Sequence, residues 1–272
     1  MRMFFEKKLL TPFAALVLLI IYVTFSVCTY MLIQELSSTD TVFTTQELYD
    51  LAVRDAVFAD PDEVYPLVEI TRESNMVTWN KTKDKILLLS CHRYPDSYPE
   101  GVDITFQWGE VWTFTDREIV QWYNHNKDDI IDWTLRLKQL IGLPPEKVYT
   151  HISAFWVDPK NVIRPAYVTD ITKQMQITSG DTYSGGDDFS LRYTEWFDNN
   201  TLWSYFDSAY PWTRLGYTYD WAGKGSEYGL SEFLVLKDSQ STVEFTKTFE
   251  SFVLWLKEQI TVDQSLSRLP YE

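Results

Sequence analysis

Cysteine is scarce in this chain. Its 272 residues include two cysteines, Cys28 and Cys91, and Cys28 falls within a long apolar run near the N-terminus. Because Cys91 is alone in the remainder, no disulfide can form within that part. A chain of this length can be stabilised by its apolar core without such a link. We therefore expect a fold that does not depend on disulfide bonds.

Histidine and glycine-rich motifs are also scarce. The three histidines, His92, His125 and His151, are not spaced as a helical pair, so a zinc site would need ligands that are distant in the sequence. The glycines near Gly185 do not join a strand to a helix with the spacing of a phosphate-binding loop. The Gly-x-Ser-x-Gly motif of serine hydrolases is absent. The sequence predicts neither a metal site nor a cofactor.

Positive charge is low. Lysine and arginine number 24 against 39 acidic residues, which gives a formal net charge of -15. Proteins that bind nucleic acid need clusters of Lys and Arg to contact phosphates, and docking on an anionic membrane surface has the same requirement. No such cluster occurs, so we expect neither partner. The acidic excess alone is typical of a soluble surface.

The most distinctive feature that is present is the uncharged apolar run at 9–33, which reads LLTPFAALVLLIIYVTFSVCTYMLI. About 20 apolar residues suffice for a helix to cross the hydrocarbon core of a bilayer. Basic residues precede the run, acidic residues follow it, and the next basic residue is Arg54. This bias predicts that the N-terminus stays in the cytoplasm and that the chain beyond the run is exported.

These flanks define the predicted domain organisation. We expect a cytoplasmic tail at 1–8, a transmembrane signal anchor at 9–33, a polar tether at 34–43 and an exported domain at 44–272. The predicted location is the cell membrane, with a single pass and an extracytoplasmic C-terminal domain. Cleavage of a signal peptide and lipid attachment at Cys28 are the alternatives. The run exceeds the roughly 7–15 apolar residues of a signal peptide, which favours an uncleaved anchor.

Short apolar segments in the exported part predict strands that are separated by helices. The 85–92 segment indicates a central strand, because it is apolar on both faces. The expected strands cover 64–71, 76–79, 85–92, 102–108, 110–114, 149–157, 231–236 and 242–246, the last two as a hairpin. The expected helices begin at Thr44 and cover 115–126, 128–141, 193–206 and 249–260, and 174–188 is expected to be a loop.

No βα unit and no internal repeat occurs among these elements. The helix at 115–126 begins with Thr115 and Glu118, which have the spacing of a capping box. We predict one α+β domain with a mainly antiparallel or mixed sheet and flanking helices, preceded by the N-terminal transmembrane helix.

Aromatic residues make up 16% of the chain, and all 11 tryptophans follow the apolar run. These rings either build the core or line a surface on which a carbohydrate or an aromatic ligand stacks. The densest segment is 210–232, which reads YPWTRLGYTYDWAGKGSEYGLSE. It combines rings, one arginine, acidic residues and glycines, so it is our first candidate for a binding surface.

Nine side chains are candidate ligand-binding residues. Rings of the 210–232 segment could stack on a ligand, its arginine could bind a carboxylate or phosphate, and its aspartate could accept sugar hydroxyls. The alternative is that these rings pack into the core and that the arginine pairs with a local acid. The candidates are Trp212, Arg214, Tyr217, Tyr219, Asp220, Trp221, His92, Glu110 and Glu232.

Two arrangements could support an enzyme. A thiol beside an imidazole is a potential nucleophile, but Cys91 and His92 are adjacent on a predicted strand and should face opposite sides. We therefore favour a buried structural Cys91. A pair of carboxylates among Glu110, Glu118 and Glu232 could hydrolyse a glycan, although exposed acids are common in this chain.

Three segments resemble an uncharacterised family of bacterial envelope proteins. They are HRYPDSY at 92–98, WTLRL at 133–137 and the aromatic segment at 210–221. The resemblance spans most of the exported domain and implies a location in the bacterial envelope. It implies no activity, cofactor or site residue.

The sequence thus favours a single-pass, membrane-anchored extracytoplasmic protein that binds a ligand or a protein partner. The membrane itself is the first expected partner, through the helix at 9–33. A glycan, a peptide or another envelope protein is the expected ligand. A cell-envelope hydrolase or transferase that uses Cys91 or a carboxylate pair is the alternative.

Overall fold

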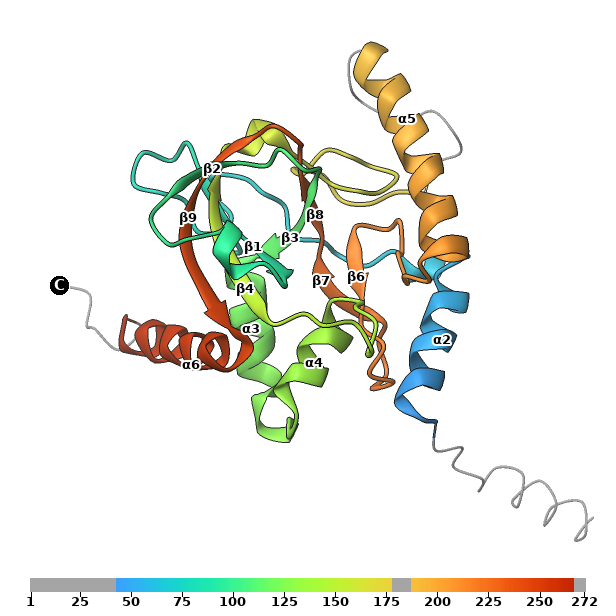
Figure 1. The fold of residues 1–272 in the computed structure, drawn as a ribbon, viewed down its shortest axis with the longest axis horizontal. Coiled ribbons are helices and arrows are strands. Elements are labelled where there is room, and N and C mark those ends of the chain that lie inside the picture. Colours follow the sequence, from blue (N-terminus) through green and yellow to red (C-terminus); the bar gives the residue numbers. More distant parts are fainter. Residues whose placement is uncertain (1–42, 178–186, 267–272) are drawn as a thin grey trace, which may run out of the picture. The chain divides into compact units, whose positions relative to one another are not determined.

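The computed structural model describes residues 43–177 and 187–266, and Figure 1 shows their arrangement. The described helices and strands belong to one compact unit, Thr45–Glu272. The apolar run at 9–33 and most of the loop predicted at 174–188 lie outside the described residues. Within the part that is described, no helix combines the length and the apolar character needed to cross a bilayer.

The fold is built on an antiparallel sheet of seven strands, in the order β2-β9-β4-β1-β3-β8-β5. Its strands are β1 Ile86–His92, β2 Asp103–Thr105, β3 Val111–Thr115, β4 His151–Val157, β5 Val162–Ile163, β8 Phe233–Val235 and β9 Gln240–Thr248. A second sheet pairs β6 Tyr217–Tyr219 with β7 Tyr228–Ser231. The predicted α+β domain with a mainly antiparallel sheet and flanking helices is confirmed.

Strand β1 lies in the middle of the large sheet, as its sequence predicts. Leu88 faces Thr115 of β3 on one side and Phe155 of β4 on the other. Residues 86–90 are all buried. A strand that is covered on both faces needs a continuous apolar run rather than an alternating one, so this element could be identified from local sequence alone.

Helices cover one face of the sheet (Figure 1). Leu87 and Leu89 of β1 pack against residues of α3, α4 and α6, and Phe252 of α6 is fully buried there. The opposite face of β1 packs against connecting segments, which contribute Val68 and Phe106. The helices are α2 Thr45–Asp55, α3 Asp116–Asn126, α4 Trp133–Leu140, α5 Asp187–Leu202 and α6 Phe249–Leu266, and a π-helical turn, η5 Trp203–Asp207, follows α5.

The hairpin predicted between 231–236 and 242–246 does not form. Strand β8 pairs with β3 and β5, whereas β9 pairs with β2 and β4. All three residues of β8 are buried, so β8 is an interior strand whose partners come from distant parts of the chain. The turn at Asp238 has a φ of 63° and carries the chain from one half of the sheet to the other.

Three further predictions of local structure are wrong. The 64–71 segment has no strand, and 76–79 contributes one isolated bridge, between Trp79 and Ile86. Helix α4 begins at Trp133, where Asp132 caps it by accepting a hydrogen bond from the Leu135 amide at 2.9 Å. The stretch before Asp132 forms a short 3-10 turn instead.

The predicted capping box of α3 is wrong as well. Glu118 accepts hydrogen bonds from the Ser231 amide at 2.8 Å and from the Tyr228 hydroxyl at 2.6 Å. Its carboxylate therefore joins α3 to β7 instead of capping its own helix. Local spacing favoured the cap, but the Glu118 carboxylate is hydrogen-bonded to residues of β7.

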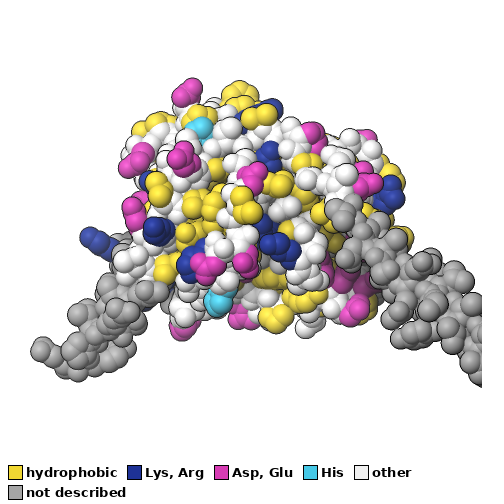
Figure 2. Space-filling model, turned by 90° about the horizontal axis from the view of Figure 1, so that it is seen from below, with side chains coloured by type: hydrophobic (Ala, Val, Ile, Leu, Met, Phe, Trp, Pro, Cys, Tyr) yellow, Lys and Arg dark blue, Asp and Glu magenta, His cyan; other side chains and the backbone are white. Residues whose placement is uncertain are grey.

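Charged side chains of both signs are interspersed with apolar ones on the face that Figure 2 shows, which is the face seen from below in Figure 1. Neither sign of charge dominates that face.

Candidate ligand-binding cavity

The aromatic segment 210–232 lies largely inside the protein. Its strands β6 and β7 pack directly on the C-terminal end of α4. A Cβ atom at Gly229 would overlap the Leu140 carbonyl oxygen and Thr218 Oγ1, so a residue without a side chain is required there. The segment is thus held in place by helix α4, and its side chains project to different surroundings.

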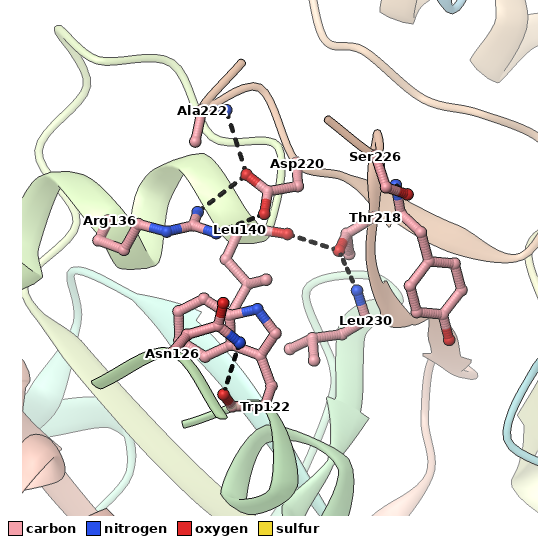
Figure 3. A network of polar contacts seen from close by, with 10 residues as sticks. Trp122, Asn126, Arg136, Leu140, Thr218, Asp220, Ala222, Ser226 and Leu230 are labelled. Atoms are coloured by element: carbon pink, nitrogen blue, oxygen red, sulfur yellow. Dashed lines mark hydrogen bonds and ion pairs between the residues drawn. The ribbon is translucent and has the colours of Figure 1, made fainter. Parts of the chain in front are cut away.

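Asp220 forms a buried ion pair with Arg136. Its carboxylate accepts two hydrogen bonds from the Arg136 guanidinium, at 2.8 and 2.5 Å, and a third from the Ala222 amide at 3.1 Å (Figure 3). The guanidinium carbon of Arg136 lies 4.7 Å from the centroid of the Trp122 ring. The pair joins α4 to the end of β6, and its charges are already compensated.

Arg214 binds the end of helix α2. Its Nη2 donates to the carbonyl oxygens of Val57 at 2.6 Å and Ala56 at 3.3 Å. Its guanidinium lies near the Tyr205 and Tyr167 rings, at 5.3 and 5.8 Å. The positive charge therefore meets the negative end of a helix, where the sequence predicted either a ligand or a local acid.

Trp221 is a core residue. It is 2% exposed, its indole N–H donates to the Leu143 carbonyl oxygen at 3.1 Å, and its ring meets Tyr49 edge-on with 5.4 Å between centroids. For Asp220, Arg214 and Trp221 the structural alternative fits their surroundings better than a ligand contact does.

The other six candidates line one cavity. Its volume is about 750 Å³, within the range of pockets that hold small organic ligands. It lies among the end of β1, the α4–β4 connection, the turn η5 and the small sheet. The predicted site residues that line it are His92, Glu110, Trp212, Tyr217, Tyr219 and Glu232.

Aromatic side chains dominate the cavity wall. Nine of the lining residues are tyrosine or tryptophan: Tyr94, Tyr98, Trp112, Tyr149, Trp203, Tyr210, Trp212, Tyr217 and Tyr219. Tyr94 and Trp203 are exposed, whereas Trp212 and Tyr217 are buried. The cavity therefore passes from a partly exposed rim to an enclosed aromatic interior.

His92 fixes the loop that borders the cavity. The Tyr94 amide donates to Nδ1 at 3.1 Å, so Nε2 carries the proton and donates to Ser153 Oγ at 2.7 Å. The Ser153 hydroxyl then donates to Thr246 Oγ1, which donates to the Tyr98 carbonyl oxygen, both at 2.5 Å. Burial lowers the pKa of His92 to about 4. Both ring nitrogens are engaged, which makes His92 a positioning residue.

Glu232 lies between β7 and β8 and faces the cavity. Its neighbours Ser231 and Phe233 are fully buried, and Ser231 contacts Glu118. Because successive residues of an extended chain point to opposite sides, Glu232 projects away from Glu118. Its own amide donates to the Gly216 carbonyl oxygen at 2.8 Å, which fixes the backbone from which the carboxyl group projects.

The Glu232 carboxyl group has no hydrogen-bond or ion-pair partner among the described residues. The side chain is half-buried, and its remaining accessible surface lines the cavity. Burial raises the pKa of Glu232 from 4.5 to about 8. A mostly protonated carboxylic acid therefore lines the cavity at neutral pH.

Cys91 also lines the cavity wall. As predicted for adjacent strand residues, Cys91 packs against the helix-covered face, whereas His92 contacts Ser153 and Tyr98. Burial raises the pKa of the Cys91 thiol. A nucleophilic cysteine needs its pKa lowered, so this environment fits the structural role that the sequence favoured.

Sequence reasoning missed several cavity residues. Tyr94 and Tyr98 belong to the HRYPDSY segment that we singled out for its resemblance, so a signal for them was available. Trp112 comes from β3, Tyr149 from the connection that precedes β4, and Trp203 from η5. No local pattern indicates that these three meet, because their proximity depends on the tertiary fold.

No group of three or more metal-ligating side chains comes together in residues 43–177 and 187–266. Comparison with protein-family models, with curated proteins and with solved structures gave no match. Any functional interpretation therefore depends on the cavity itself, and the resemblance to bacterial envelope proteins stays a prediction.

Proposed function

We propose that this protein is a membrane-anchored, extracytoplasmic binding protein whose cavity takes a small organic ligand. The observation that carries the proposal is the 750 Å³ cavity with its nine aromatic lining residues. Aromatic walls bind the apolar faces of sugar rings, aromatic groups and organic cations. A fragment of an envelope glycan or peptide that carries such a group is the ligand class we favour.

The environments of the polar side chains that line the cavity favour ligand binding over catalysis. His92 uses both ring nitrogens within the fold, and burial raises the pKa of the Cys91 thiol. A hydrolase is the second candidate, because the raised pKa of Glu232 suits a general acid at neutral pH. Glu110, which is exposed and lines the same cavity, would be its partner carboxylate.

Two tryptophans provide a matched test of the binding site. Trp203 lines the cavity and is 46% exposed, whereas Trp108 is 94% exposed and does not line it. We suggest titrating the full chain, purified in detergent, with peptidoglycan fragments, oligosaccharides and small aromatic compounds while its tryptophan fluorescence is recorded. Trp203→Ala should weaken any ligand at least about fivefold, and Trp108→Ala should change its affinity less than twofold.

The outcome separates the candidates. Equal effects of Trp203→Ala and Trp108→Ala, or no ligand in the whole series, would contradict a binding function of this cavity. Cleavage of a glycan fragment that is lost in both Glu232→Gln and Glu110→Gln would favour the hydrolase instead.

The proposed location needs a separate experiment, since 9–33 lies outside the described residues. Intact cells that express the chain with a C-terminal epitope tag should lose the tag on protease treatment and retain a membrane-bound N-terminal fragment. A tag that is protected until the cells are lysed would contradict the extracytoplasmic location.

A further inference from the structure

Glu232 differs from the other buried acids of the domain. Glu118 accepts hydrogen bonds from Tyr228 and Ser231, and Asp220 is paired with Arg136. The Glu232 carboxyl group has no such partner in the described residues, and it faces a cavity. Buried charged groups are normally paired. The Glu232 backbone is fixed by its amide hydrogen bond to Gly216. A carboxyl group that is left unpaired at a cavity on such a backbone indicates that its partner belongs to the ligand.

The basic residues that line the cavity are already engaged elsewhere. Arg93 Nε donates to the Tyr94 hydroxyl at 2.8 Å, and its guanidinium lies 5.1 Å from the centroid of that ring. Lys147 Nζ donates to the Tyr210 hydroxyl at 3.0 Å and lies 4.4 Å from its ring centroid. Glu232 experiences no resolved electrostatic effect from either residue, since burial alone accounts for its raised pKa.

Two neutral polar side chains of the cavity wall, those of Thr218 and His92, are already hydrogen-bonded within the fold. Thr218 Oγ1 donates to the Leu140 carbonyl oxygen at 2.8 Å and accepts from the Leu230 amide at 2.9 Å. His92 is bonded at both nitrogens. A polyhydroxylated ligand needs several convergent polar groups, whereas a half-buried carboxylate among aromatic rings suits a single positive charge.

We propose that the ligand of this cavity carries a substituted ammonium group, which pairs with the Glu232 carboxylate and lies against the aromatic wall. This inference rests on the proposed binding function and specifies its ligand class. An ammonium group loses hydration on entry, and ring faces together with a carboxylate replace the lost interactions. The net charge of -15 attracts such ligands at long range.

Binding is coupled to the release of a proton. The carboxyl group must ionise to pair with the cation, so affinity should rise with pH up to the pKa of Glu232 in the empty cavity, about 8. Seven other lining groups with shifted pKa values stay neutral between pH 6 and 8: His92, Cys91, Tyr98, Tyr149, Tyr210, Tyr217 and Tyr219. The charged lining groups besides Glu232 are Arg93, Glu110, Glu146 and Lys147.

Choline and its neutral isostere 3,3-dimethylbutan-1-ol are suitable probes, because the charge of choline does not titrate. We would measure both affinities by calorimetry on the full chain in detergent. The wild type should bind choline at least about tenfold more tightly than the alcohol, and its affinity for choline should rise up to about tenfold from pH 6 to pH 7. Glu232→Gln should abolish both effects and leave binding of the alcohol within twofold.

Glu258→Gln is the control, because Glu258 is an exposed acid of helix α6 that does not line the cavity. It should change the affinity for choline less than threefold and preserve the pH dependence. Equal binding of choline and the alcohol, or equal losses of choline affinity in both variants, would overturn the inference. If the wild type binds a ligand from the fluorescence series but does not bind choline, this inference is overturned and the proposed function stands. Protein that binds neither overturns the proposed function too.

Discussion

Replacing Glu232 by glutamine should make the folded protein more stable at neutral pH. Burial raises the pKa of Glu232 from 4.5 to about 8. The unfolded chain therefore loses this proton at a lower pH than the folded protein does. Since the unfolded state ionises first, its free energy falls relative to the folded state as the pH rises. Wild-type stability is fully present below about pH 4.5 and declines toward pH 8.

The size of the effect follows from the two pKa values. One pKa unit corresponds to about 1.4 kcal/mol. Glu232 should cost the wild type about 1 kcal/mol at pH 5 and about 3 kcal/mol at pH 7. Glutamine has the same shape and does not ionise. The free energy of unfolding of Glu232→Gln, relative to wild type, should thus increase by roughly 2–3 kcal/mol between pH 5 and pH 7.

Urea denaturation of the full chain in detergent, followed by tryptophan fluorescence at pH 5, 6 and 7, measures this difference. Glu110→Gln is the control, since the exposed Glu110 lines the same cavity. Its difference from wild type should vary by no more than about 0.5 kcal/mol over that range. A difference between Glu232→Gln and wild type that stays constant with pH would refute the reasoning.

Other predictions concern the structural residues. Asp220→Asn leaves the buried Arg136 without its partner and should lower the free energy of unfolding by about 3–5 kcal/mol in urea denaturation; a loss below about 1 kcal/mol would contradict the ion pair. Gly229→Ala introduces a Cβ that overlaps the α4 backbone and should cost more than about 2 kcal/mol in the same assay, so wild-type stability would contradict this packing. Cys91, in a Cys28→Ser background, should react with iodoacetamide slowly in the native protein and quickly in urea, because burial raises its pKa. Rapid labelling of the native protein would instead support Cys91 as a nucleophile.

The parts of the fold that were predictable from the sequence have local causes. Strand β1 is buried on both faces, and its run of consecutive apolar residues predicts that burial. Helix α6 has apolar residues at helical spacing because one side of it packs on the sheet. Strands β8 and β9 look like a hairpin for equally local reasons, yet each finds its partners far along the chain. Turn residues in the local sequence do not indicate which distant strands will pair with β8 and β9.

The candidate site was likewise predictable only in part. Residue type marked Glu232 and Trp212 as candidate ligand-binding residues, and both line the cavity. Residue type could not show that Asp220 pairs with a residue 84 positions away, or that Arg214 binds a carbonyl 157 positions away. A charged side chain that pairs within the fold cannot be distinguished, from the sequence alone, from one that is available to bind a ligand.

The carboxyl carbon of Glu232 offers the most direct test of the whole interpretation. We would record its ¹³C chemical shift by NMR as a function of pH in the full chain, with Glu232→Gln identifying the signal. The interpretation predicts a titration near pH 8 in the empty protein, and a shift to a lower pH when choline is added. A titration near pH 4.5 that choline does not alter would contradict it.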